Sequence, residues 1–134
     1  MQESLISAQS LPRVERLRGR KTFNLLFRLA RKKEEGPLRL YAVGFLLNLG
    51  YPPLQVAFAV PKKIVRRATH RHRIRRRLWE AYRLQKEWFL SRLPCGQMWL
   101  LWQWHSPLIP SLPLLQRQMQ NLYSQATEAW YEGC

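Results

Sequence analysis

The sequence predicts a single α+β domain in which helices pack on one face of a small sheet. Three segments carry the apolar content expected of strands, and three others repeat apolar residues at helical spacing. The chain has 134 residues, of which 46% are hydrophobic, so it can fill one core but not two ordinary domains. The predicted order is helix–strand–strand–helix–strand–helix.

We expect the polar residues 1–12 to form a loose N-terminal tail and residues 13–134 to form the domain. The first helix is predicted at 19–33, where apolar residues recur at i, i+3, i+4 and i+7. These residues are Phe23, Leu26, Phe27 and Ala30. The Gly36-Pro37 pair that follows ends the helix.

Two strands are predicted next, at 37–47 and 54–60, and the Gly and Pro residues between them favour a hairpin. In the second strand the larger apolar side chains share one face. The small residues Ala57 and Ala59 lie on the other face, which indicates that another segment packs closely there.

The second helix is predicted at about 68–90, and a helical projection separates its two sides. Its core face holds Ile74, Leu78, Ala81, Tyr82, Gln85, Trp88 and Phe89. The far side holds His72, Arg75, Arg76, Trp79, Arg83 and Lys86. A strand at 97–104, apolar on both faces, should complete a strand–helix–strand unit. A last helix should follow Ser111, with an apolar stripe from Leu115 to Trp130.

The charge of the chain is unbalanced, with 23 Lys and Arg against eight acidic residues and a net charge of +15. Nine of these basic residues lie between Pro61 and Arg77, where there is no acid. Solubility does not require such clustering, so we expect a polyanionic partner.

Three features of the basic stretch favour nucleic acid over a membrane. It contains seven Arg and two Lys, and Arg binds phosphate bidentately and stacks on bases. It opens a helix, whose free backbone N–H groups can also bind phosphate. The apolar side of that helix is ordinary core and is not suited to lie in a bilayer.

The residues available for catalysis argue against a metal nuclease. His70 and His72 lie about 200° apart on a helix and cannot bind one metal ion together. The basic stretch has no carboxylate and the chain has no Asp, so a two-metal site has no ligands. A metal-free acid–base ribonuclease that uses two of His70, His72 and His105 stays open.

The other signals suit an intracellular, cytoplasmic protein. Cys95 and Cys134 are too few for a disulfide framework, and the N-terminus has no apolar signal segment. The apolar runs are far shorter than the ~20 residues that span a membrane.

Residues 60–83 closely resemble the signature of the bacterial ribonuclease P protein component. Lys62-Lys63 match its lysine pair, Arg71-His72-Arg73 its Arg-Asn-Arg triplet, and Leu78 with Glu80 to Arg83 its helix. Phe23 and Phe27 fall on the two phenylalanine positions of its first helix. The resemblance extends over residues 13 to about 127. It departs from the family at His72, where Asn is usual, and at Trp79, where Arg is usual.

The resemblance implies the protein subunit of ribonuclease P, an RNA endonuclease that removes the 5′ leader from precursor tRNA. Catalysis is then expected in the RNA subunit with Mg²⁺, with no catalytic residue and no cofactor held by protein side chains. The implied partners are the ribonuclease P RNA and the precursor tRNA leader, and neither DNA nor a membrane. The family fold also implies a left-handed strand–helix–strand crossover.

The site residues fall into two predicted sets. The set facing the RNA subunit is Lys62, Lys63, Arg66, Arg67, Arg71, His72, Arg73, Arg75 and Arg76. The set facing the leader is Phe23, Phe27 and Tyr41, although the spacing of the two phenylalanines equally suits a core position. The alternatives are a structural RNA-binding protein of ribosomal type and the stand-alone histidine ribonuclease.

Overall fold

The computed structural model describes residues 13–48, 50 and 52–128. The strands are β1 (Arg31–Glu35), β2 (Leu38–Phe45), β3 (Leu54–Ala59) and β4 (Gln97–Trp104). The helices are the 3-10 turn η1 (Arg13–Glu15), α2 (Arg20–Leu29), α3 (Ala68–Leu84), α4 (Lys86–Ser91) and α5 (Leu112–Thr127). This confirms the α+β class. The predicted tail at 1–12 and Trp130 lie outside the described residues.

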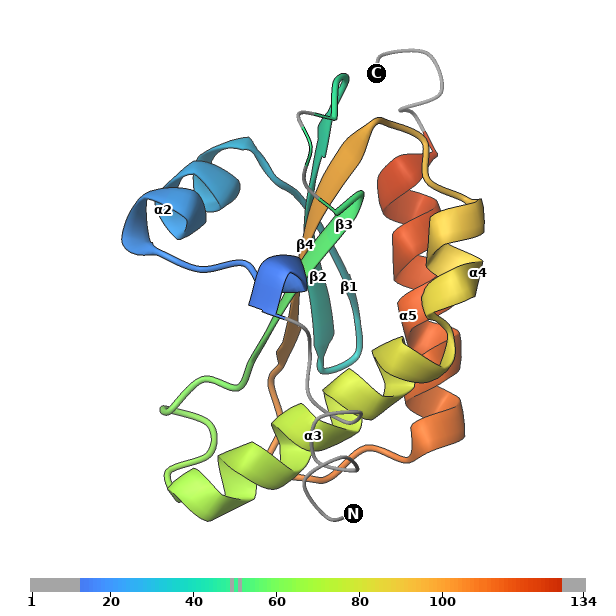
Figure 1. The fold of residues 1–134 in the computed structure, drawn as a ribbon. Helices are drawn as coiled ribbons and strands as arrows, with labels where there is room; N and C mark the ends of the chain where they lie inside the picture. The colour runs from blue at the N-terminus through green and yellow to red at the C-terminus, as the bar shows by residue number, and fades with distance from the viewer. Residues whose placement is uncertain (1–12, 49, 51, 129–134) are drawn as a thin grey trace, which may run out of the picture.

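The four strands form one mixed sheet in the order β1-β2-β4-β3 (Figure 1). The central strand β4 pairs antiparallel with β2 and parallel with β3. Its bounds coincide with the predicted apolar strand. Because β3 and β4 are parallel neighbours, the helices between them form the predicted crossover unit. The hand of this crossover stays a prediction of the family resemblance.

Helices cover both faces of the sheet, and not one face as predicted. Helices α3, α4 and α5 pack on the face that carries Leu100 and Trp102, whereas α2 lies on the opposite side (Figure 1). There Leu26 of α2 packs with Val43 and Leu101 in a second, smaller core. The reason is the strand β4 itself, whose apolar side chains alternate to both faces and must be covered on both.

The predicted hairpin between residues 37–47 and 54–60 is wrong. These segments form β2 and β3, and β4 lies between them in the sheet. The hairpin partner of β2 is β1, which occupies residues assigned to the end of the first helix. The two strands turn at Gly36, whose positive φ of 56° suits a two-residue hairpin turn. The charged strand β1 has no apolar alternation to reveal it. It is held by the backbone ladder and by an ion pair of 3.2 Å between Arg39 Nε and Glu34 Oε2.

The second predicted helix is divided at Gln85, where α3 ends and α4 begins. The buried Gln85 side chain binds α5 at this break. Its Nε2 donates to the Gln116 carbonyl at 3.2 Å, and its Oε1 accepts from Gln120 Nε2 at 2.9 Å. The interruption therefore fixes the helices of the main core against each other.

The segment of residues 13–18, which we call the N-terminal strap, lies along the outer edge of β3. Arg16 forms a parallel bridge with Val56, whose carbonyl accepts from the Leu17 N–H at 2.9 Å. The buried Glu15 carboxylate pairs with Lys86 at the start of α4. The strap thus covers part of an exposed sheet edge and joins it to the helical layer.

Candidate nucleic-acid interface

A groove of about 670 Å³ lies at the edge of β3, between the strap and α2 on one side and α3 on the other. It is lined by Arg16, Leu17, Phe23, Val56, Ala57, Phe58, His72, Arg75, Arg76 and Trp79. We call it the basic groove. It brings Phe23 of the predicted leader set together with His72, Arg75 and Arg76 of the predicted RNA set.

The periodicity of α3 explains why one side of this helix forms a groove wall. Its core residues, among them Ile74 and Leu78, are fully buried against the sheet and α5. The four groove residues His72, Arg75, Arg76 and Trp79 recur at i, i+3, i+4 and i+7, which places them on one stripe. The helical register predicted from the sequence is therefore confirmed.

His72, which stands where the resembled signature has Asn, is oriented by its neighbour Arg75. The Arg75 Nη2 lies 3.2 Å from His72 Nδ1. Because a guanidinium can only donate, the neutral imidazole accepts at Nδ1 and carries its proton on Nε2. His72 therefore presents an N–H donor at Nε2.

Trp79 places a large aromatic side chain in the groove. Its ring centroid lies 6.3 Å from that of Phe58 and 6.1 Å from that of Tyr82. The buried indole Nε1 has no hydrogen-bond partner among the described residues. The groove thus has an aromatic floor between cationic walls, which is the arrangement that single-strand binders use for stacked bases.

The loop entering α3 presents exposed cations, with one exception. Lys62, Lys63, Arg66 and Arg67 are exposed, as is Arg73 in the helix. Arg71 is half-buried in the first turn, where its Nη1 donates to the carbonyls of Val65 at 2.9 Å and Arg66 at 2.8 Å. Arg71 therefore shapes the loop on which the other cations lie.

Phe27 and Tyr41 form a separate aromatic pair outside the basic groove. Their rings meet edge to face with centroids 5.2 Å apart, and Lys32 Nζ lies 5.9 Å from the Tyr41 centroid. Phe27 is 51% exposed, so it is not a core residue. Phe23 packs against the smaller core and also lines the groove. The two phenylalanines thus differ in environment.

Arg16 and Phe58 are groove residues that sequence reasoning missed. Strand alternation places Phe58 on a core face, and Arg16 begins the segment 16–28 that resembles the family's first helix but receives no site role from it. Only the docking of the strap on β3 brings Arg16 beside α3, and no local signal in the sequence indicates that docking.

The three histidines lie in three different environments. His70 Nε2 contacts the Pro107 carbonyl, His72 pairs with Arg75, and His105 Nε2 lies 3.0 Å from Gln103 Oε1. No group of three or more His, Cys, Asp or Glu among the described residues could hold a metal ion. In this part of the chain, no histidine pairs with another to form the acid–base couple that a stand-alone nuclease needs.

Three comparisons relate the chain to known proteins. The family model described as Ribonuclease P matches residues 11–127. A ribonuclease P protein component from Synechococcus sp. (strain RCC307) is 34% identical over an alignment of 98 residues, and the match covers 68% of this chain and 74% of that protein.

Two solved structures share the fold. The ribonuclease P protein from Thermotoga maritima has a TM-score of 0.64 and 20% identity, over 83% of this chain and 96% of that one. The Staphylococcus aureus protein has a TM-score of 0.63 and 14% identity, over 84% and 94% of the respective chains.

Replacing Arg71 by Gln should lower the free energy of unfolding by about 1 kcal/mol, because two carbonyls of the entry loop lose their donor. Arg73→Gln is the matched control, since this arginine is exposed on the same helix, and it should change stability by less than about 0.5 kcal/mol. Urea denaturation measures both. Equal stabilities for the two variants would show that Arg71 does not hold the loop.

The imidazole of His105 should titrate below 6.5. Burial lowers its pKa, and the nearby cations Arg39 and Lys32 lower it further, while Glu34 opposes them. Any stability that this residue contributes is then present above pH 6.5 and lost as the pH falls through its folded pKa. A pH titration followed by NMR should show the midpoint rising in Arg39→Gln and unmoved in Arg73→Gln. A midpoint at or above 6.5 in the unaltered protein would contradict the burial argument.

Proposed function

The chain belongs to the ribonuclease P protein family, and from this premise we propose that it assists a catalytic RNA in removing the 5′ leader from precursor tRNA in the cytoplasm. It takes part in an endonuclease complex as the protein component. Its partners in this proposal are the ribonuclease P RNA and the single-stranded leader. The observation that carries the proposal is the basic groove, which joins Phe23 to the cationic stripe of α3.

The charge distribution supports two different roles for the cations at the N-terminal end of α3. The exposed cations are proposed to bind RNA, and Arg71 is proposed to hold the loop that carries them. Exposed cations of the entry loop and helix are free to follow an RNA backbone, which binds chiefly through phosphates. The set proposed to face the RNA subunit is Lys62, Lys63, Arg66, Arg67, Arg71, His72, Arg73, Arg75 and Arg76. Within it, Arg71 acts through the shape of the loop.

The aromatic residues support the proposed leader contacts. Phe23 lines the groove, and the exposed Phe27, one turn further along α2, pairs with Tyr41, so the two phenylalanines offer two neighbouring stacking positions. An unpaired strand can use both, because stacking on aromatic rings needs no particular sequence. Duplex RNA buries its bases in pairs and would gain nothing from these rings.

The protein side chains are proposed to bind and orient RNA and not to perform the cleavage. A divalent ion such as Mg²⁺ prefers carboxylate and phosphate oxygens, whereas the groove offers guanidinium, imidazole and aromatic groups. We therefore assign Mg²⁺ to the RNA subunit, where it would activate the attacking water. The protein's cations would reduce the repulsion between the two RNA molecules that must meet there.

Purified protein should stimulate leader removal when it is combined with a bacterial ribonuclease P RNA and precursor tRNA at low Mg²⁺. Each component is omitted in turn, and the products are resolved on a denaturing gel. Cleavage by the protein alone would support the histidine ribonuclease instead. Binding of the RNA without stimulation would support a structural protein of ribosomal type.

Phe27→Ala should weaken binding of leader-bearing tRNA to the reconstituted complex by about 1–3 kcal/mol, the value of one stacked base. Binding of mature tRNA, which has no leader, should be unchanged. Leu29→Ala is the matched control, because Leu29 is also an exposed apolar residue of α2, at 55% exposure. An equal loss for both variants, or an equal loss for both tRNAs, would rule out a leader contact at Phe27.

A further inference from the structure

The strap and the first helix carry a second concentration of basic residues, to which the proposed function gives no role. Residues 16–33 contain eight Lys or Arg and no acid. None of the eight belongs to the set proposed to face the RNA subunit or to the set proposed to face the leader. Their density is comparable to that of the stretch at 61–77, so they require an explanation of the same kind.

The fold gathers four of these cations on the outside of α2 and on the end of the strap. Leu26 is fully buried and defines the inner side of α2. Lys21, Asn24 and Arg28 recur at i, i+3 and i+7, and all three are exposed on the opposite side of the helix. We call the exposed cations Arg18, Arg20, Lys21 and Arg28 the outer cationic face.

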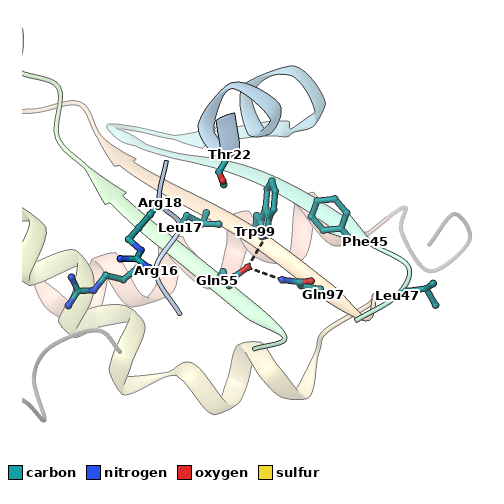
Figure 2. A pocket seen from close by; sticks show the side chains of 9 residues that line it. All are labelled: Arg16, Leu17, Arg18, Thr22, Phe45, Leu47, Gln55, Gln97 and Trp99. Carbon is teal, nitrogen blue, oxygen red and sulfur yellow. Dashed lines mark hydrogen bonds between the residues drawn. The ribbon is translucent and has the colours of Figure 1, made fainter. Parts of the chain in front are cut away.

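A hollow of about 460 Å³ lies on the inner side of α2, between this helix and the sheet (Figure 2). It is lined by Arg16, Leu17, Arg18, Thr22, Phe45, Leu47, Gln55, Gln97 and Trp99. Thr22 is the residue of α2 that lines it. At 3.6 residues per turn, Lys21, Asn24 and Arg28 lie about 100° or more around the helix from Thr22. These three residues of α2 therefore point away from the hollow and into solvent.

Arg16 and Arg18 connect the outer cationic face to the basic groove. Arg16 lines both the groove and the hollow, and Arg18 lines the hollow. Figure 2 shows both arginines on the strap, on the side of the hollow away from Phe45. Gly19 then turns the chain with a φ of 96°, which suits glycine, and Arg18 and Arg20 flank this turn. A polyanion that leaves the groove at Arg16 would therefore meet cations as far as the first turn of α2.

The first turn of α2 is built against the stability of its own helix. The N-terminus of a helix carries a partial positive charge, which disfavours cations there. The first turn of α2 nevertheless contains Arg20 and Lys21 and no acid, and the N-cap Gly19 provides no side-chain hydrogen bond. None of the four cations of the outer face forms an ion pair with an acid of the described residues. A bound polyanion would supply the missing negative charge.

An RNA backbone suits the outer cationic face better than a membrane surface does. Three of its four cations are arginines, whose guanidinium groups bind phosphate through two parallel hydrogen bonds. The apolar side of α2 packs on the sheet through Leu26 and is not available to a bilayer. The family also implies an RNA partner. Because the face consists of cations alone, it can bind phosphates without reading bases.

We propose that the outer cationic face binds the phosphate backbone of the 5′ portion of a long leader, after the leader has left the basic groove. The proposal rests on the proposed function and adds a second binding surface to it. From Arg20 to Arg28 the helix spans about 12 Å, so only a leader that continues beyond the groove can follow it. Binding there depends on leader length and on salt, but not on leader sequence, because the cations contact phosphates.

The test measures binding of precursor tRNAs with two leader lengths to the complex of full-length protein and ribonuclease P RNA. Leaders of about 4 and about 16 nucleotides bracket the site sizes of small single-strand-binding domains. The long leader should bind more tightly than the short one, equally for leaders of uridine and of adenosine. Each phosphate contact adds about 0.7 to the slope of log affinity against log salt, so Lys21 and Arg28 together should make this advantage shrink about 7-fold between about 50 and 200 mM salt.

Lys21→Gln combined with Arg28→Gln should remove this salt-dependent part of the long leader's advantage. Both positions are exposed, so the variant should fold normally. The matched control is Arg92→Gln combined with Arg117→Gln, which removes the same net charge from exposed positions beyond α4 and in α5, on the other face of the sheet. This control should leave the advantage unchanged. Lys21→Arg combined with Arg28→Lys keeps both charges and should also behave like the unaltered protein.

Three results would overturn this proposal alone. The first is an advantage that Lys21→Gln with Arg28→Gln leaves unchanged, or that the control variant reduces equally. The second is the absence of any advantage of the long leader over the short one in the unaltered protein, and the third is an advantage confined to one base. In each case a short leader that binds more tightly than mature tRNA would leave the proposed function standing. Equal binding of mature tRNA and of both precursors would overturn the proposed function as well.

Discussion

The strand β4 carries bulky apolar side chains on both of its faces, and the rest of the architecture follows from the need to cover them. Helices α3, α4 and α5 bury Leu100 and Trp102 completely on one face. On the other face the cover is a single helix and the narrow strap, which together bury Leu101. This thinner cover leaves the basic groove at its border. The proposed RNA-binding surface thus lies on the incompletely covered side of the sheet.

The elements that the sequence predicts well are those with strong periodicity. β4 was predicted with its observed bounds, and the stripe of α3 from His72 to Trp79 has the expected register. β1 was missed because its charged residues show no alternation and its stability comes from backbone pairing with β2. Strand order was missed for a related reason. Pairing between distant segments depends on the whole fold, and local turn residues favoured a hairpin that β4 displaces.

The sequence predicts which residue types the candidate site contains, but it does not predict how the fold brings them together. Clustered arginines identified the segment that is proposed to meet a polyanion, and helical projection identified which of them share a face. The function of Arg71 as a support for its own loop depends on two carbonyl positions that a linear sequence does not reveal. The same holds for Arg16, which reaches the basic groove only through the strap. Site residues that are far apart in sequence can be recognised as neighbours only in the folded structure.

The strap has a consequence for the order in which this protein acquires its activity. Its bridge joins Arg16 to Val56, and the parallel pair β3–β4 joins segments that are equally distant in sequence. Contacts over such separations form late in folding, because long loops must close first. The arginines of α3, by contrast, carry their charge in the unfolded chain. Under the proposed function, the chain therefore carries the charge that attracts RNA before the strap completes the basic groove.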